Sequence, residues 1–443
     1  MLYVLLFFLL IGLFISYRMT NRNILSPWVL AHMMYLFSTL ILVMNYDMVI
    51  DISFDTVAVI VVSLLSFGIG EIFIKQTVFS KSTKLYYAQE DEIRPIIISK
   101  WAYLLSLACI IVWTYISYLN FNLIGSYLGG ENFVAKYVLV RKAIVNASNG
   151  IEMEIETGSY GLLNYLGYFV EVLVYAFVFV LIYNKAYKIK DCKRIIYYLL
   201  PVLLYLPSCI LTTTRSVFIK LLAVIGIMLF FVYKQSCHGW GDVKNNTKII
   251  RIGIVLAASF FVIFSFVGQL KEQEVKEDVS GTICAYAGAS ICGLDAYLNG
   301  RYIRKSDYPG QVTMEGIYTL LNKIGFDYPP PAYHQEDFVW GKKGQTTNIF
   351  SAPFYVLIDF PFIALIFISF FWGAVLGYFM NVIKFGRVKI YNYGYYILIG
   401  MLYYPVIMIS ITDAFRHLIG TAFLLSLISI YLLKYVLKIE KVA

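Results

Sequence analysis

The chain has 443 residues, of which 60% are hydrophobic, 17% aromatic and only 14% charged. A soluble globular protein carries about 25% charged residues, so this composition excludes a soluble domain and requires a bilayer around most of the chain. The net charge of +9 does not indicate a nucleic-acid partner, because the basic residues lie in short stretches between apolar runs. The six cysteines show no CxxC or Cys/His spacing, and we predict neither a metal site nor a cofactor.

Apolar runs that can span a bilayer recur along the whole chain. We therefore predict an all-α fold, a polytopic integral membrane bundle of about 11 transmembrane helices in one membrane domain, 1–443, because a spanning helix needs roughly 20 apolar residues. No basic segment precedes the first run and no cleavage site follows it, so we expect a retained helix there. The runs cover residues 2–17, 28–45, 54–74, 102–120, 159–183, 195–212, 216–233, 252–268, 361–383, 393–412 and 418–437.

Lysine and arginine gather in every second connection between these runs. The connections after the first, third, fifth, seventh and ninth runs, together with the C-terminus, contain most of the 36 basic residues. Basic residues are retained on the cytoplasmic side of a membrane. The N-terminus is therefore predicted to lie outside and the C-terminus in the cytoplasm.

The connection over residues 269–350 is long compared with the others and is predicted to lie outside. Connections of this length are usually functional or disordered, and its aromatic, glycine and proline residues favour a large, ordered extracytoplasmic loop. Its segment 281–300 is weakly apolar. Asp295, Asn299 and many small residues favour an interfacial or re-entrant helix there over a further span.

Glu171 lies near the middle of the fifth run, where a charged side chain usually has a partner. Asn164, Tyr168 and Tyr175 lie at helical spacing from it, so the four side chains share one face. They form either a hydrogen-bonded stripe facing the bundle or the wall of a polar cavity, where Glu171 would contact substrate.

Two other polar positions inside the runs have simpler interpretations. Glu71 has Lys75 four residues later, a spacing that predicts an ion pair on the helix surface. His32 is alone in an apolar helix, and a hydrogen-bonded core histidine is a better interpretation than a ligand.

A hydroxyl-rich turn with two basic residues follows the sixth run. Arg215 lies in the turn Thr212–Ser216, and Lys220 comes one helical turn later. An arginine, hydroxyls and a lysine at a helix start suit a phosphate or diphosphate. The alternative is that both long side chains extend to lipid headgroups.

The last outside turn contains an acid, a guanidinium and an imidazole within five residues. Asp413, Arg416 and His417 supply an orienting group, an anion clamp and a general base. The alternative is a charged turn at the membrane surface. In the long loop, Arg301 and Arg304 form a further basic cluster that could contact an anionic substrate.

At this point the pattern resembles the oligosaccharide repeat unit polymerases, the Wzy-type O-antigen and capsule polymerases of bacteria. The layout carries most of the resemblance: about eleven spans, a large outside loop in the second half and short cytoplasmic connections. Such polymerases often have glycine after the Asp-Phe pair, where this chain has Pro361. The residues that add to the resemblance are Arg215 in its Thr/Ser context, Gly344, Thr347, Asn348, Asp359, Phe360 and Gly373.

The resemblance implies a glycosyltransferase of the bacterial cytoplasmic membrane with a GT-C-like architecture. Its substrate would be undecaprenyl diphosphate carrying an oligosaccharide, and a growing chain would pass from its lipid diphosphate to a new lipid-linked unit. A diphosphate leaving group needs cations but no nucleotide or metal. Asn348 and Asp359 would contact substrate, and a chain-length regulator and a flippase would be partners.

Two other classes remain open. An O-antigen ligase would share the substrate and the layout, but its acceptor would be a lipid A core. A polysaccharide flippase or other transporter tends toward short, regular connections and internal repeats, and the long loop counts against it. No Walker lysine, HExxH, GxSxG or DxD motif is present, which weighs against ATPases, proteases, esterases and metal-dependent sugar-nucleotide transferases.

Overall fold

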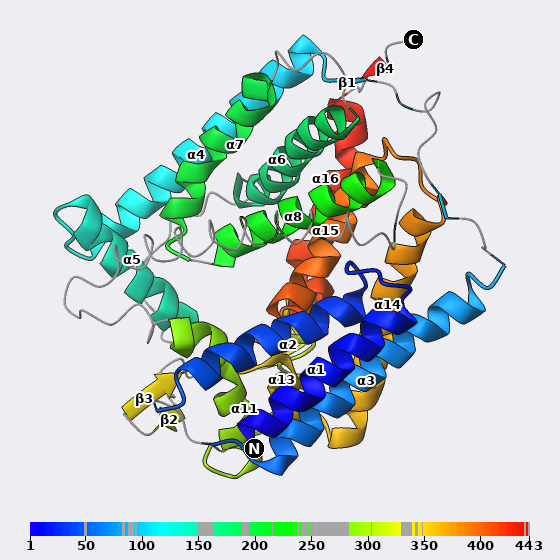
Figure 1. Cartoon of the computed structure of the whole chain (residues 1–443). Helices are drawn as coiled ribbons and strands as arrows, with labels where there is room; N and C mark the ends of the chain where they lie inside the picture. Colours follow the sequence, from blue (N-terminus) through cyan, green and yellow to red (C-terminus); the bar gives the residue numbers. More distant parts are fainter. Residues whose placement is uncertain are drawn as a thin grey trace.

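The structure, a computed structural model, is almost entirely helical in the residues that it describes (Figure 1). Its longest helices are α1 (Leu2–Met19), α2 (Pro27–Met44), α3 (Phe54–Thr77), α4 (Lys100–Tyr127), α5 (Phe133–Ser148), α6 (Leu163–Ala186), α7 (Ile195–Leu211), α8 (Ser216–Ser236), α14 (Phe362–Lys384), α15 (Tyr393–Met408) and α16 (Thr421–Val436). The described residues are 1–47, 51–81, 85–86, 93, 95–148, 163–187, 195–214, 216–236, 240, 247, 251, 253, 255, 283–302, 304–328, 339–341, 344–347, 349–437 and 440–441.

The helices lie where the apolar runs predict them, wherever the structure describes those runs. Seven of these helices are long and apolar enough to cross a membrane, namely α1, α2, α3, α4, α6, α8 and α14. Helices α7, α15 and α16 are apolar but shorter. The predicted span 252–268 lies outside the described residues apart from 253 and 255. The chain is therefore an all-α membrane protein, as its composition predicts.

Helices α3 and α14 make the most extensive contact between two elements (Figure 1). A Cβ atom at Gly373 would lie 1.9 Å from the carbonyl oxygen of Phe67, and one at Gly70 would lie 2.1 Å from that of Phe370. Only glycine permits such close backbone contact, which is how small residues bring membrane helices together. The crossing therefore fixes α14 against α3.

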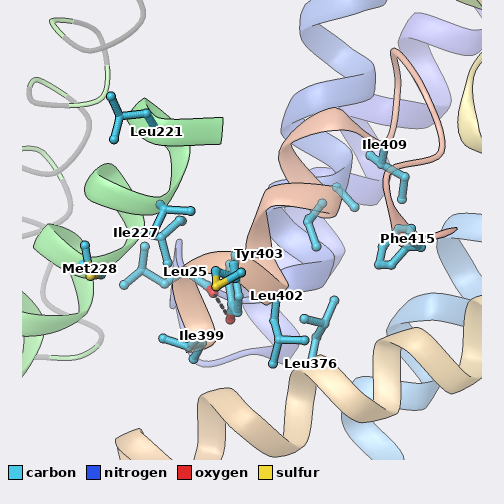
Figure 2. Packing of buried hydrophobic residues seen from close by; sticks show 14 of the residues in the cluster. Leu25, Leu221, Ile227, Met228, Leu376, Ile399, Leu402, Tyr403, Ile409 and Phe415 are labelled. Carbon is cyan, nitrogen blue, oxygen red and sulfur yellow. Dashed lines mark hydrogen bonds between the residues drawn. The ribbon is translucent and has the colours of Figure 1, made fainter. Parts of the chain in front are cut away.

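Helix α15 lies between this pair and a second group of helices. It contacts α8 and α6 as well as α2 and α14. Ile399 faces Ile227 of α8, while Leu402 lies beside Leu376 of α14 (Figure 2). The Tyr403 hydroxyl donates a hydrogen bond to the carbonyl oxygen of Leu25 at 3.0 Å (Figure 2). One continuous apolar core therefore extends across both groups.

The two chain ends lie at opposite ends of the molecule (Figure 1). The N-terminal ammonium pairs with Asp51 at 2.7 Å. Two residues further on, the Ser53 backbone N–H donates to Asp295 of the long loop at 2.6 Å. At the other end, β1 (Ile96–Ile97) pairs with β4 (Glu440–Lys441). The N-terminus and the long loop therefore share one end of the molecule.

The described part of the loop 269–350 is ordered into short elements. They are η3 (Cys284–Gly288), α11 (Ser290–Leu298), α12 (Glu315–Lys323), the hairpin β2 (Val339–Gly341) and β3 (Gly344–Thr347), followed by α13 (Ala352–Asp359). Within the segment 281–300, α11 has only nine residues and extends about 14 Å, much less than a bilayer core. This helix is buried against α3, η3 and α13.

Candidate functional site

The turn between α15 and α16 is built around a buried carboxylate. Asp413 is 4% exposed, and its Oδ1 accepts a hydrogen bond from the backbone N–H of Phe415 at 2.9 Å. This bond starts the short 3-10 helix η4 (Phe415–Ile419). Phe415 anchors the turn, because its ring lies 4.9 Å from that of Trp372 on α14. The carboxylate therefore shapes the backbone that carries the next two residues.

Arg416 lies on η4, where it contacts an aromatic ring and lies near an acidic side chain. Its guanidinium carbon is 5.0 Å from the centre of the Tyr355 ring, a cation–π contact. The positive charge of Arg416 also acts on the carboxylate of Asp413. Burial raises the pKa of Asp413 to about 6, although the charge of Arg416 opposes the shift. The guanidinium therefore lies against a tyrosine ring, close enough to Asp413 for the two charges to interact.

A cavity of about 150 Å³ opens beside this turn. Its walls are apolar side chains of α3, α13 and α14, among them Leu64, Phe67, Val356, Leu365 and Trp372. The charged residues in its lining are Asp413 and Arg416 of the turn. An apolar hollow that meets a cation suits a molecule with an apolar chain and an anionic head.

On the other side of the turn, α6 and α8 are joined by an ion pair. The Lys220 ammonium lies 2.8 Å and 3.1 Å from the two carboxylate oxygens of Glu171, and the Tyr175 hydroxyl donates to Oε1 at 2.7 Å. Glu171 is 13% exposed and Lys220 30%. Lys220 thus pairs with Glu171 rather than extending to lipid headgroups. Tyr175 was predicted to share the face of Glu171, whereas the pairing with Lys220 was not predicted.

His417 connects the ion pair to the turn electrostatically. His417 is exposed at the surface of the protein, yet nearby protein atoms still desolvate it, and the charges of Arg416 and Lys220 act in the same direction. All three effects lower the pKa of His417 below its usual value, so its imidazole is neutral at neutral pH. Tyr404 of α15 lies in the fields of both Glu171 and Arg416. The structure therefore gathers five of the predicted site residues: Glu171, Lys220, Asp413, Arg416 and His417.

Asp359, predicted to contact substrate, instead holds a segment of the long loop. Its carboxylate accepts from the Thr313 backbone N–H at 2.6 Å, from the Thr313 hydroxyl at 2.7 Å and from the Val312 N–H at 3.1 Å. The Ser306 hydroxyl also donates to it. Because Thr313 lines the cavity, its hydrogen bonds to Asp359 hold part of the cavity wall in place.

The remaining predicted site residues do not meet this group in the described structure. Arg301 forms an ion pair with Asp295, a buried acid that also accepts from the Thr56 hydroxyl at 2.8 Å on α3. Arg304 is half-buried on the same loop. Arg215 and Asn348 lie outside the described residues.

Sequence reasoning missed three residues of the site. The Tyr355 ring contacts Arg416, Thr313 lines the cavity, and the charges of Glu171 and Arg416 both act on Tyr404. They come from three separate segments, and tyrosine is so frequent here, with 38 copies, that no single one stands out. Only the spatial arrangement identifies them.

The group combines positive charge with a possible proton acceptor. No cluster of three His, Cys, Asp or Glu side chains with metal-binding geometry is present among the described residues. Arg416 and Lys220 supply positive charge, and neutral His417 can accept a proton. Comparison with protein-family models, with curated proteins and with solved structures gave no match.

Proposed function

We propose that this protein is a metal-independent glycosyltransferase that joins lipid-linked oligosaccharide repeat units into a surface polysaccharide, of the O-antigen or capsule kind. The lipid would be undecaprenyl diphosphate, in the bacterial cytoplasmic membrane. The observation that carries the proposal is the position of Arg416. It lies at an apolar cavity among the helices, next in the chain to the neutral imidazole of His417, whose pKa the charge of Lys220 also lowers.

Each part of this arrangement has a role in such a transfer. The apolar cavity receives the first part of the prenyl chain, and Arg416 and Lys220 hold the diphosphate. The bond from the sugar anomeric carbon to the diphosphate oxygen breaks, and a bond from that carbon to an acceptor hydroxyl oxygen forms. His417 takes the hydroxyl proton, and the diphosphate leaves on its lipid. Asp413 shapes the turn and balances Arg416.

The proposed orientation places the reaction at the outer face, with the N-terminus outside and the C-terminus in the cytoplasm. The sharing of one end by the N-terminus and the long loop supports it, since both are predicted to lie outside. The opposite end carries the C-terminus and β1, which follows a lysine-rich connection. Partners in the same membrane would be a flippase and a chain-length regulator.

The purified chain in lipid vesicles, supplied with an undecaprenyl-diphosphate oligosaccharide alone, tests the proposal. We expect a ladder of lipid-linked products that increase by whole repeat units. A deletion strain should correspondingly display single repeat units at its surface. Transfer that requires an added lipid A core would make the protein a ligase instead. Movement of the substrate across the vesicle without any new glycosidic bond would make it a transporter.

A further inference from the structure

Helix α12 in the long loop has an apolar face that the protein leaves uncovered. Met314, Ile317, Leu320 and Ile324 are exposed by 37%, 40%, 39% and 68%. At 3.6 residues per turn they fall within an arc of about 120°. Such an arc on a short helix is typical of a helix lying flat in a membrane interface.

One edge of the same helix is fixed to the membrane domain. A Cβ atom at Gly316 would lie 2.4 Å from the Cα atom of Gly420, so the two backbones touch. Gly420 joins η4 to α16, the last helix of the bundle. Helix α12 therefore sits at the level where α16 begins, with its apolar arc turned away from the protein.

The apolar arc adjoins a helix that also exposes apolar side chains. Helix α12 contacts α16, whose Leu424 and Ile428 are 49% and 54% exposed. Beside the arc, the rings of Tyr308, Tyr318 and Tyr328 cluster with centres 4.7–5.5 Å apart. Tyrosines gather at the membrane–water boundary, because the ring is apolar and the hydroxyl is polar. Two independent features thus place α12 at that boundary.

From this arrangement we infer that α12 lies in the interface of one phospholipid leaflet, with its apolar arc among the acyl chains. Met314 belongs to the arc and also lines the cavity beside Arg416. The first turn of α12 is therefore the threshold between the bilayer and the cavity, across which a membrane-borne apolar chain enters sideways. The identity of the entering chain rests on the proposed function, whereas the position of α12 does not.

Spin labels test the position directly in the full-length protein in phosphatidylethanolamine–phosphatidylglycerol vesicles. Labels are attached to Leu320→Cys and Ile324→Cys on the arc, and to Thr319→Cys as the matched exposed position on the opposite side. The labelled wild-type chain gives the background from native thiols. We expect the two arc labels to be protected from a water-soluble nickel chelate and accessible to dissolved oxygen, with the reverse order at Thr319.

Equal nickel access at all three positions would overturn the interfacial position and put α12 in water. Mutual broadening between arc labels on two chains would overturn it in favour of a dimer contact. For the threshold, Ile317→Glu in the first turn of α12 should shorten the polymer ladder while Thr319→Glu leaves it unchanged. Equal ladders would remove the threshold role. Absence of a ladder in the wild type would reject the proposed function alone, since the spin-label result needs no activity.

Discussion

Two helix pairs flank the turn Asp413–His417, and different interactions hold each pair together. Helices α3 and α14 meet backbone to backbone through glycines, and an apolar cavity lies beside their crossing. Helices α6 and α8 are joined by the Glu171–Lys220 ion pair. Under the proposed function, the cavity side would accommodate the apolar chain of the substrate and the ion-pair side would hold charge. Arg416 connects the two sides of the turn, because it lines the cavity and its charge also lowers the pKa of His417.

Removing the cation at the boundary should have the largest effect. Arg416→Ala is expected to lower the polymerisation rate about 10²–10³-fold, the loss seen when one preorganised charge-stabilising donor is deleted. Arg416→Lys should also be impaired, because lysine lacks the planar fork that stacks on Tyr355 and binds two oxygens. The measurement is the initial rate of ladder formation in vesicles.

Arg387 offers a matched control for this variant. Its guanidinium carbon lies 4.2 Å from the centre of the Phe79 ring, so it is also a stacked arginine, but at the end of α14 remote from the turn. Arg387→Lys should therefore retain the wild-type rate. Equal loss in both variants would mean that stacked arginines act through folding and not at the site.

The packing of α3 against α14 can be disrupted by a substitution at their crossing. Gly373→Ala would place a methyl group 1.9 Å from the Phe67 carbonyl oxygen, so the helices must separate. We expect a loss of about 1–3 kcal/mol in unfolding free energy, the usual cost of overpacking. Thermal unfolding in detergent measures it. At Gly253, Phe230 Cζ at 3.8 Å would be the nearest side-chain atom to the new methyl among the described residues, and Gly253→Ala should be nearly neutral.

The sequence predicts the helices well but not their polar contacts. Long apolar runs are local signals, and they suffice to place the helices on both sides of the turn. The prediction for Glu71 as a surface partner of Lys75 was wrong. Glu71 is 2% exposed and accepts hydrogen bonds from the Ser26 hydroxyl at 2.8 Å and the Trp28 N–H at 2.9 Å, capping α2. A contact with a helix start so far along the chain leaves no periodic signal.

The sequence predicts which residue types the candidate site contains but not which of these residues lie close together. His32, for example, is a buried core histidine that contacts the Trp28 carbonyl oxygen, as its isolation in an apolar run predicts. The sequence could not distinguish the loop residue Arg301 from the residues that gather at the candidate site, because it does not show that Asp295 lies beside Arg301. The sequence shows which side chains are charged, whereas helix packing determines which of them lie close together.

The polar side can be tested with a double-mutant cycle. Glu171→Gln, Lys220→Met and the double variant give the coupling between the two charges. We expect about 1–2 kcal/mol, above the ~0.2–1 kcal/mol of exposed pairs and below the ~3–5 kcal/mol of fully buried ones, because both groups are partly exposed. Chemical unfolding measures the coupling. Additive effects would show that the pair is not energetically linked.

The smallest expected effect concerns pH and the acid that balances Arg416. The pKa of Asp413 is raised to about 6, so at this pH half of the molecules lose the carboxylate charge. If the ionised form is needed, the ladder rate should fall by about half from pH 8 to pH 6. His417 does not contribute to this fall, because its pKa is lowered and the ring stays neutral throughout.

Asp413→Asn separates this acid from other titrating groups. Its amide oxygen can still accept the Phe415 N–H, so the turn is retained while the charge is lost. A raised pKa means that folding favours the protonated acid, and the stabilisation present at low pH is lost as pH rises through 6. Wild-type stability should therefore increase from pH 7 to pH 5 by a component that Asp413→Asn lacks. An identical stability profile, together with an identical fall in rate, would assign the titration to another residue, and the balance of charge at Arg416 would then have to come from Glu171 on the polar side.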